Sequence, residues 1–593
     1  MAAAVAGSLL LPIGVLTSGV ASASAAPAAV SAAFASTGLV TPDTPTVDIT
    51  LPQGVTAAEI AKDPETTGVT IAVDSPDDNL DYPALGGGEI KGRGNFTWTL
   101  KKKPYQIKLK DAAPLLGMDS AKTWILLANH ADASLMRNKI AFDLAGDIGM
   151  PFSPQSKWVD LRINGDYMGN YLLTEKVEVK ANRVDLSDPS AVIAELDNNY
   201  GTAEDYYFRS TASKTVYTLK DQKGAVPSTV GDWNESAKTQ ATKVGWDDIK
   251  KDINTLDALL DQSTPDWAAI SDLIDVESFV KMYLVQELTM NIDAANSSLY
   301  LYKNGTSDKL HAGPVWDFDI TLGNYSRGEG SDTKSEFVKN LDVLRSTASP
   351  LWDDLFRNPD FVKQANAVWT EDVAYHASKL PSKIDDYKAT VALSAANNFK
   401  RWSILGTPSL LGSSGGTYAS SYSTEVSDLR SWVASRQSHL RKAYGDVPVL
   451  QYRAHVQSLG WLHRVNTGQI AGTVGQARRL EAFSLAKLTS PAAGSIQAKS
   501  HVQSIGWSSS WRSTDLVGTT GRGLRLEAFQ LRLTSGLATR YNISYRAHVQ
   551  GIGWQPWVTN GATAGTTGQA KRVEAVQVRI LEKTSPTPVA PTP

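Results

Sequence analysis

The 593-residue chain contains no cysteine, which excludes disulfides, thiolate-based zinc sites and cysteine nucleophiles together. Its formal net charge is only −3, so the chain as a whole lacks the basic field that attracts nucleic acid or acidic lipid. No GxxxxGK(S/T) motif occurs, which excludes a P-loop enzyme. Beyond the N-terminal segment, no run reaches the ~20 apolar residues that a membrane span requires. These absences leave a folded protein whose length indicates more than one domain.

The N-terminal segment is small and apolar and contains Ala-Ser-Ala ending at Ala25. This pattern predicts a secretory signal peptide over residues 1–25, although no Lys or Arg precedes Lys62 to supply a positive start. The alternative is a disordered Ala-rich tail. Residues 26–45 are rich in Ala, Pro, Ser and Thr and are expected to form a linker. The expected location is therefore outside a bacterial cell, secreted or at the cell surface.

Hydrophobic periodicity predicts a β-rich part followed by a helical part. Residues 47–110 alternate apolar and polar side chains, as strands do, and residues 133–146 have helical spacing that ends on Gly146. A hairpin is expected to turn at Asn164, Gly165 and Asp166. Helical patterns dominate after Trp246. The predicted fold class is α+β, with a β-rich lobe before a helical lobe.

Three acidic residues frame a short hairpin-like segment between Asn291 and Gly323. Asp293 precedes the apolar run SLYLYK, and Asp317 and Asp319 follow the run KLHAGPVW. Phosphoryl transfer uses such a set, because one carboxylate orients the attacking hydroxyl and others hold Mg²⁺ on the nucleotide phosphates. In a strand, Asp317 and Asp319 would point to the same side, where two carboxylates need a shared cation. The alternatives are a capping role for Asp293 after a helix ending near Met290, and a solvated turn for the pair.

This segment, with IKGRGNFTW, KKPYQIKL, ANHADASLMRNKIAFDLA and GNYLLTEKVEV in the same order, resembles the CotH kinase family over residues 46–445. The resemblance implies an atypical, two-lobe kinase-like domain that uses ATP and Mg²⁺ and phosphorylates Ser or Thr of a protein substrate. It implies that Asp293 is the catalytic base and that Asp317 and Asp319 bind the metal. Kinases carry a second metal ligand five residues after the catalytic Asp, where this chain has Ser298; Asn296 lies close by, and either could bind Mg²⁺.

Several basic residues are candidates for contacting the nucleotide phosphates. Lys108 is preferred, because Ile107 and Leu109 flank it on the opposite face of an expected strand. The resemblance implies Arg93 and Arg137 as further phosphate-facing candidates. Lys103 and Glu175 complete the set for cofactor binding, Glu175 as a partner of the lysine or of the nucleotide. A solvated surface charge is the alternative for each basic residue.

Three copies of one unit occupy the C-terminal part, beginning at His455, His501 and His548. In each copy Gly-Thr begins 17 residues after the His, and a Glu follows at 26 residues. This regularity marks a tandem repeat. The repeats resemble the clostridial hydrophobic repeats with a Gly-Trp, and they are predicted to be separate all-β modules at 450–488, 496–535 and 543–582, before a tail at 583–593. Trp461, Trp507 and Trp554 are expected to fill the small cores of these modules.

The sequence therefore predicts an exported CotH-like protein kinase that its repeats tether to a cell-envelope ligand, with neither nucleic acid nor membrane span. Two other functions stay open. One is a surface-binding or adhesin protein whose kinase fold does not catalyse. The other is a polysaccharide hydrolase, which would use two carboxylates across a sugar cleft and need no nucleotide.

Overall fold

The computed structural model describes residues 39–204, 206–224, 237–325, 333, 337–340, 348–412, 416–444, 449–489, 494–513 and 515–583. The expected signal peptide (1–25), most of the expected linker and almost all of the expected tail lie outside these residues. Within the described ranges, no helix is both long enough and apolar enough to cross a membrane.

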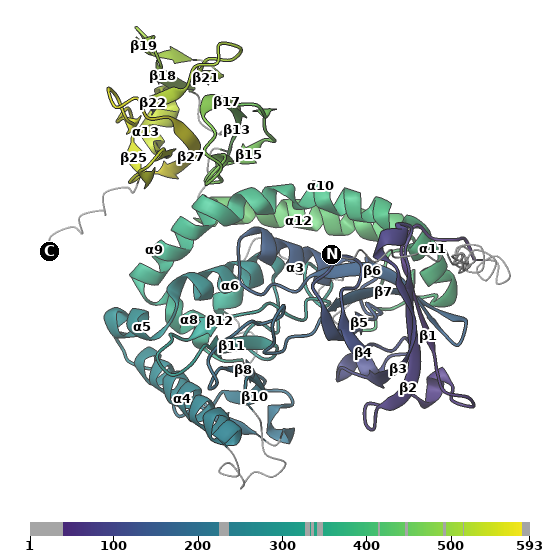
Figure 1. The fold of residues 1–593 in the computed structure, drawn as a ribbon. Helices are drawn as coiled ribbons and strands as arrows, with labels where there is room; N and C mark the ends of the chain where they lie inside the picture. Colours follow the sequence, from purple (N-terminus) through teal and green to yellow (C-terminus); the bar gives the residue numbers. More distant parts are fainter. Residues whose placement is uncertain are drawn as a thin grey trace, which may run out of the picture.

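The first part of the chain is a closed β-barrel (Figure 1). Neighbouring strands follow the order β1-β2-β3-β4-β5-β7-β6, and parallel pairing of β1 with β6 closes the barrel. The alternation seen in the sequence puts Val47, Ile71, Ile107 and Trp124 into a buried interior. The strands are β1 (Thr46–Thr50), β2 (Thr66–Asp74), β3 (Tyr82–Gly92), β4 (Tyr105–Ala113), β5 (Ala121–Leu127), β6 (Ser156–Ile163) and β7 (Asp166–Glu175).

The predicted hairpin connects β6 and β7. Asn164 and Gly165 have φ of +51° and +85°, the left-handed values that a tight two-residue hairpin turn requires. Helix α3 (Arg137–Asp147) begins later than the sequence pattern suggests, because Asp132 and Ser134 form a turn in front of it.

The second part combines a sheet with helices. The sheet has the order β12-β11-β8-β10-β9, and one continuous core joins it to α3 and to the helices that follow. The mixed α and β content agrees with the predicted class, whereas a two-lobe kinase arrangement is not confirmed, since the N-terminal part is mostly β. The strands are β8 (Val192–Leu196), β9 (Tyr207–Arg209), β10 (Val216–Gln222), β11 (Leu299–Lys303) and β12 (His311–Ala312). The helices are α4 (Ala237–Leu260), α5 (Trp267–Leu273), α6 (Val276–Thr289), α8 (Leu351–Phe356), α9 (Pro359–Val368), α10 (Ala374–Thr390), α11 (Ala392–Arg401) and α12 (Tyr422–Tyr444).

The strand expected to run up to Trp316 ends at Ala312. Gly313 has a φ of +140°, and Pro314 has no N–H to donate to a neighbouring strand, so the ladder stops there. Asp317 and Asp319 consequently lie in a loop, and the argument that strand alternation aligns them is wrong.

The repeats share one core, so the expectation of three separate modules is wrong. Each repeat lends a short strand to its neighbour: β21 (Leu516–Gly518) pairs with β17 (Leu480–Thr489), β26 (Ala564–Gly565) with β22 (Leu526–Leu533), and β16 (Ala471–Gly472) with β27 (Val573–Glu582). The exchange closes into a ring. A side chain on Gly472, Gly518 or Gly565 would collide with the neighbouring repeat's backbone, which explains the repeated glycine.

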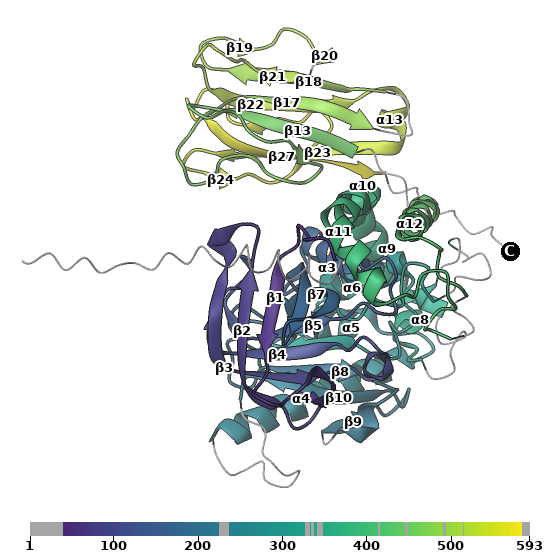
Figure 2. The same ribbon diagram turned by 90° about the vertical axis from the view of Figure 1, so that its right-hand side faces the viewer.

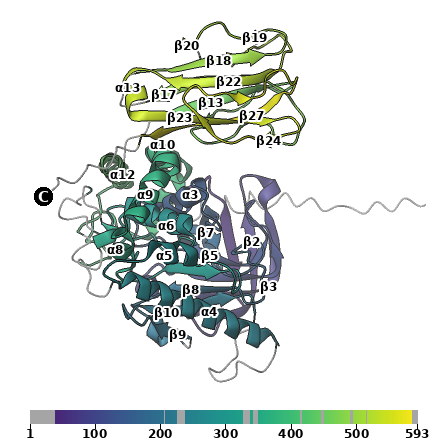
Figure 3. The same ribbon diagram turned by 90° about the vertical axis from the view of Figure 1, so that its left-hand side faces the viewer.

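The repeats lie beyond α10 and α12, and Figure 2 and Figure 3, which view the molecule from opposite sides, both show this arrangement. An ion pair between Arg579 and Glu371 of 3.3 Å links them to the preceding part. The remaining elements are β13 (Val449–Val456), β14 (Gly460–Trp461), β15 (Val465–Asn466), β18 (Ile496–Val502), β19 (Gly506–Trp507), β20 (Arg512–Ser513), α13 (Ser535–Arg540), β23 (Tyr541–Val549), β24 (Gly553–Trp554) and β25 (Val558–Thr559).

Candidate functional site

A cavity of about 370 Å³ lies where the loop after β3 meets the sheet of β8, β10 and β11. Five of the residues predicted from the sequence line this cavity, although they come from three separate parts of the chain. They are Arg93, Asp293, Ser298, Asp317 and Asp319. The structure therefore brings the predicted acidic set together in a concave site.

Asp293 lies in the turn that follows α6. The helix ends at Thr289, and Met290 adopts a left-handed conformation that stops it. The side chain of Asn291 then accepts a hydrogen bond of 3.0 Å from the Asp293 amide, while the Asp293 carbonyl accepts bonds from Asn296 and Ser297. Backbone hydrogen bonds thus form the turn, and Asp293 lines the cavity from it.

The two other carboxylates sit on the loop after β12. Asp317 has a φ of +66°, a left-handed conformation that is uncommon for non-glycine residues. The loss of water around its carboxylate raises the pKa of Asp317 to about 6. The charge of Asp293 adds to this shift, and the charge of Arg93 opposes it. Burial, and then the charge of Asp317, raise the pKa of Asp319 well above its usual value. The loop thus holds acidic groups that repel one another.

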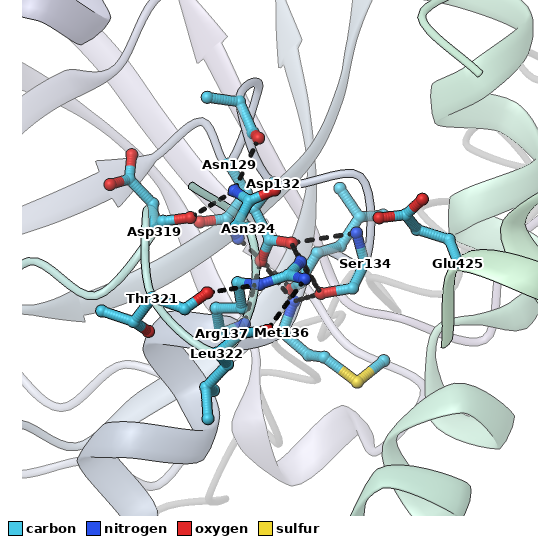
Figure 4. Close-up of polar contacts among 12 residues, drawn as sticks. Asn129, Asp132, Ser134, Met136, Arg137, Asp319, Thr321, Leu322, Asn324 and Glu425 are labelled. Carbon is cyan, nitrogen blue, oxygen red and sulfur yellow. Dashed lines mark hydrogen bonds and ion pairs between the residues drawn. The ribbon is translucent and has the colours of Figure 1, made fainter. Parts of the chain in front are cut away.

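Buried contacts hold this loop in place (Figure 4). The Asn324 side chain donates to the carbonyls of Asp319, at 2.6 Å, and Ala131, at 2.9 Å. The Asn138 side chain accepts from the Phe318 amide at 2.7 Å. The loop that carries the two carboxylates is therefore fixed from the segment between β5 and α3.

Arg137 provides the charged part of this support. Its guanidinium forms an ion pair with Asp132 and donates to the carbonyls of Thr321, at 2.9 Å, and Leu322, at 3.3 Å (Figure 4). The Asp132 carboxylate also accepts from the backbone amides of Met136 and Arg137. Arg137 is thus placed under the loop and outside the lining of the cavity.

The Gly-spaced loop after β3 forms another wall. Gly94, Asn95 and Thr97 line the cavity beside Arg93, whose guanidinium lies 5.1 Å from the centroid of the Trp316 ring. Burial lowers the pKa of Arg93, while Tyr300 and Asp317 act against that shift. Arg93 is the predicted basic residue that the structure places against the acidic set.

The structure does not bring the other predicted cofactor residues to the cavity. Lys108 lies on the outer face of the barrel, 44% exposed, and pairs with Glu89 at 2.9 Å. Lys103 donates to the Trp98 carbonyl and lies over the Trp98 ring, and Glu175 pairs with Arg183 at 2.7 Å. Asn296, expected as a metal ligand, is fully buried and is absent from the lining. The phosphate-contacting role expected for Lys108 is therefore not supported by its position.

A lysine that the sequence reasoning missed does line the cavity. Lys220 on β10 pairs with Glu195 on β8 at 2.6 Å, and its ammonium lies 5.3 Å from the centroid of the Tyr300 ring. Burial alone would lower the pKa of Lys220, but the Glu195 carboxylate raises it overall. A signal was present in VIAEL, where Glu195 interrupts a run of apolar residues that all become buried.

The residues in the cavity fit Mg²⁺ bound with a nucleotide. Within the described ranges, no three His, Asp or Glu side chains are grouped as a complete metal site. Mg²⁺ commonly takes only one or two protein carboxylates and completes its shell with phosphates and water. Asp317 and Asp319 supply such oxygens, Ser298 lies 3.5 Å from Asp317, and a cation would relieve the repulsion that raises the pKa of both carboxyls.

Comparisons with known proteins match two families to separate parts of the chain. Residues 90–440 match the model of the family described as CotH kinase protein. Residues 455–486, 501–535 and 548–582 match the model described as Clostridial hydrophobic W. The inner spore coat protein H of Bacillus subtilis (strain 168) is 26% identical over 271 residues, which are 45% of this chain and 67% of that protein.

Proposed function

Since the chain belongs to the CotH kinase protein family, we propose that it transfers the γ-phosphoryl group of ATP to a Ser or Thr hydroxyl of a secreted or cell-surface protein. The observation that carries this proposal is the convergence of Asp293, Asp317, Asp319 and the Lys220–Glu195 pair on one cavity. A kinase needs these groups: carboxylates for the metal and the hydroxyl, and a lysine held for the phosphates.

Each residue has a distinct role in this proposal. Asp293 orients the acceptor hydroxyl and receives its proton, because it alone of the three carboxylates lies on the turn after α6. Asp317 and Asp319 would hold Mg²⁺, with Ser298 beside them. When bound, Mg²⁺ neutralises charge on the nucleotide phosphates.

Lys220 and Arg93, the basic residues in the lining of the cavity that are discussed above, would contact the phosphates. Lys220 is fixed by Glu195 and by the Tyr300 ring, so its ammonium is positioned before a nucleotide arrives. Arg93 is fixed by the Trp316 ring and leads into the Gly94–Thr97 loop, whose backbone amides can approach phosphate closely.

The repeats and the spore coat relative support a location at a bacterial surface or coat. We place the protein there, with the repeats as the tethering part. The proposed domain limits are those expected from the sequence, 46–445 for the kinase-like part, with the repeats acting as one unit.

Incubation of the full chain with γ-labelled ATP, Mg²⁺ and casein as acceptor tests the proposal. Label should pass to Ser or Thr of the acceptor or of the chain itself, and Mg-ATP should raise the melting temperature. Stabilisation by Mg-ATP without transfer of label would support a kinase fold that binds but does not catalyse. Absence of both, with release of sugar from wall polysaccharide, would support a hydrolase.

A further inference from the structure

Each repeat builds the same polar constellation on its surface. In the first repeat, the rings of His455 and Trp461 lie 5.2 Å apart between centroids, and His455 Nδ1 lies 3.2 Å from a Glu481 carboxylate oxygen. Arg479 pairs with the other carboxylate oxygen at 2.8 Å. The second and third repeats give nearly equal distances for His501, Trp507, Glu527 and Arg525, and for His548, Trp554, Glu574 and Arg572.

A neighbouring repeat completes each constellation. The amide of Thr519, the residue after β21 of the second repeat, donates to the Glu481 carbonyl at 3.0 Å. Trp461 on β14, His455 on β13, Glu481 on β17 and Thr519 thus follow one another across the sheet, and we call each such set a row. Thr473 and Thr566 make the equivalent contacts with Glu574 and Glu527. The row therefore exists only in the closed ring of three repeats.

The threonine hydroxyls in these rows are not satisfied by the protein. Among the described residues, the Oγ1 atoms of Thr473, Thr519 and Thr566 are shielded and find no hydrogen-bond partner. A shielded hydroxyl without a partner costs roughly 1–3 kcal/mol. The same cost at all three junctions marks a repeated feature rather than a local accident of packing.

The tryptophans lie at the surface, so the expectation that they fill the cores is wrong. Trp461 is 36% exposed, and none of the three belongs to the buried core of the repeats. The residue two positions before each tryptophan is exposed as well, at 45% for Leu459, 48% for Ile505 and 47% for Ile552. Apolar surface thus borders a row of carboxylate, guanidinium and hydroxyl groups three times over.

The charge of the repeats differs sharply from that of the whole chain. Residues 449–583 contain 16 Lys and Arg against 5 Asp and Glu, although the complete chain carries a net charge of −3. The remainder is therefore acidic, and the near-neutral total conceals a strongly basic unit. Such a unit attracts polyanions.

We propose that the three rows are equivalent binding sites for an anionic polysaccharide of the bacterial envelope. A sugar ring has an apolar face that matches the exposed Leu or Ile and the tryptophan beside it. Its hydroxyls match the arginine of each row and the arginines that lie over Trp461 and Trp554, which are Arg453 and Arg546. The basic surface suits acidic groups along the polymer. A peptide strand is disfavoured, because β14, at the edge of its sheet, offers only the two residues Gly460 and Trp461 for pairing.

This inference supplies the ligand class for the tethering role proposed above, and it does not depend on kinase activity. The test measures only the binding of the protein to cell walls, so a failure of phosphoryl transfer would not affect its result. Three equivalent sites on a repetitive polymer act together, which gives avidity that no single site has.

The test uses sedimentation of the full chain with protease-treated cell walls of a Gram-positive bacterium. Binding should survive the protease treatment and disappear after periodate oxidation, which cleaves the vicinal diols of sugars. Replacing Trp461, Trp507 and Trp554 together by Ala should lower the apparent affinity by about 10²-fold or more, and each single replacement several-fold. Trp511→Ala is the matched control, since Trp511 packs on Arg532 outside the rows and should bind normally.

A second set of variants keeps the test independent of folding. Leu459→Ser, Ile505→Ser and Ile552→Ser change only exposed side chains, and together they should weaken wall binding about tenfold or more with an unchanged circular dichroism spectrum. Wall binding by the triple Trp variant equal to that of the unaltered chain would overturn the proposal. So would loss of binding after protease treatment, or tighter binding to duplex DNA or phosphatidylglycerol vesicles than to walls.

Discussion

The ammonium of Lys220 lies 2.6 Å from the carboxylate of Glu195, and both line the cavity that also contains Asp293, Asp317 and Asp319. The pair joins neighbouring strands β10 and β8 on the side where these strands face the site. The pair therefore holds a lysine ammonium in the same cavity as three further carboxylates. In the proposed function, the lysine binds the phosphates, and the carboxylates bind the metal and transfer the proton.

Lys220→Met should weaken Mg-ATP binding by about tenfold or more, because a charge-assisted contact to phosphate contributes roughly 1.5–3 kcal/mol. Isothermal titration with a non-hydrolysable ATP analogue measures the change. Lys108→Met is the matched control, since Lys108 pairs with Glu89 on the outer face of the barrel and should leave binding unchanged. Equal losses in the two variants would remove Lys220 from the site.

Asp293→Asn should lower phosphoryl transfer by about 10²-fold or more while leaving Mg-ATP binding intact. The reason is that the carboxylate acts on the acceptor hydroxyl and contributes little to holding the nucleotide. Initial rates and nucleotide affinity, measured on the same preparation, separate the two effects. A variant that transfers label at the normal rate would show that Asp293 serves only the turn after α6.

Asp317→Asn should raise the melting temperature of the metal-free protein only slightly at pH 7.5, because the residue is exposed and water screens its charge, and it should abolish the stabilisation by Mg-ATP. The folded state raises the pKa of Asp317 to about 6, so the ionised carboxylate destabilises the fold above that pH. The advantage of the variant should shrink as pH falls through about 6 towards 4, where the carboxyl of the unaltered protein becomes neutral too. Calorimetry at several pH values, with and without Mg-ATP, checks both parts, and an Mg-ATP shift equal to that of the unaltered chain would contradict the metal-binding role.

Arg137→Met should destabilise the fold by about 3–5 kcal/mol, because it leaves the buried Asp132 carboxylate without its ion-pair partner. Denaturant unfolding measures the loss. Arg430→Met is the control: Arg430 pairs with Asp385 at 3.1 Å on the surface, where such pairs contribute about 0–1 kcal/mol. If the two variants unfolded alike, the loop that carries Asp317 and Asp319 would not depend on this support.

A chain that ends at residue 535 should lose the structure of its first two repeats, whereas one that ends at 446 should stay soluble with normal Mg-ATP binding. Ending the chain at residue 535 removes β26 and β27, which pair with β22 and β16, and so opens the shared core. Limited proteolysis and circular dichroism distinguish the outcomes. Protease-resistant first and second repeats in the longer fragment would show that each repeat folds alone.

Local patterns predicted the features that depend on local interactions. The turn at Asn164 and Gly165 follows from the left-handed conformations that a tight hairpin requires, and the barrel strands follow from their alternation. The convergence of Asp293, Asp317 and Asp319 on one cavity was also accessible from the sequence, because the three residues flank a short segment and lie close together along the chain.

The missed features depend on partners that are distant in sequence. The apolar neighbours of Lys108 do place it on the opposite face, but β4 belongs to a closed barrel, where the face opposite the core meets solvent. The ammonium of Lys220 is held in the cavity by contacts with Glu195 and Tyr300, which lie on other strands. The sharing of strands among the repeats was likewise hidden, since identical spacing fits separate modules and a closed ring equally well.

The cyclic lending of strands among the repeats fixes how many copies the unit can have. With one copy or two, at least one long strand would lack the short strand that pairs with it. With three copies every such edge is paired, so a fourth copy would have no unpaired edge to join. A unit with a single copy would therefore need two further chains to complete the ring. Within one chain the copies can differ individually: the second and third carry Trp511 and Trp557, which lie over Arg532 and Arg579, whereas the first has Ala486 at the position of that arginine.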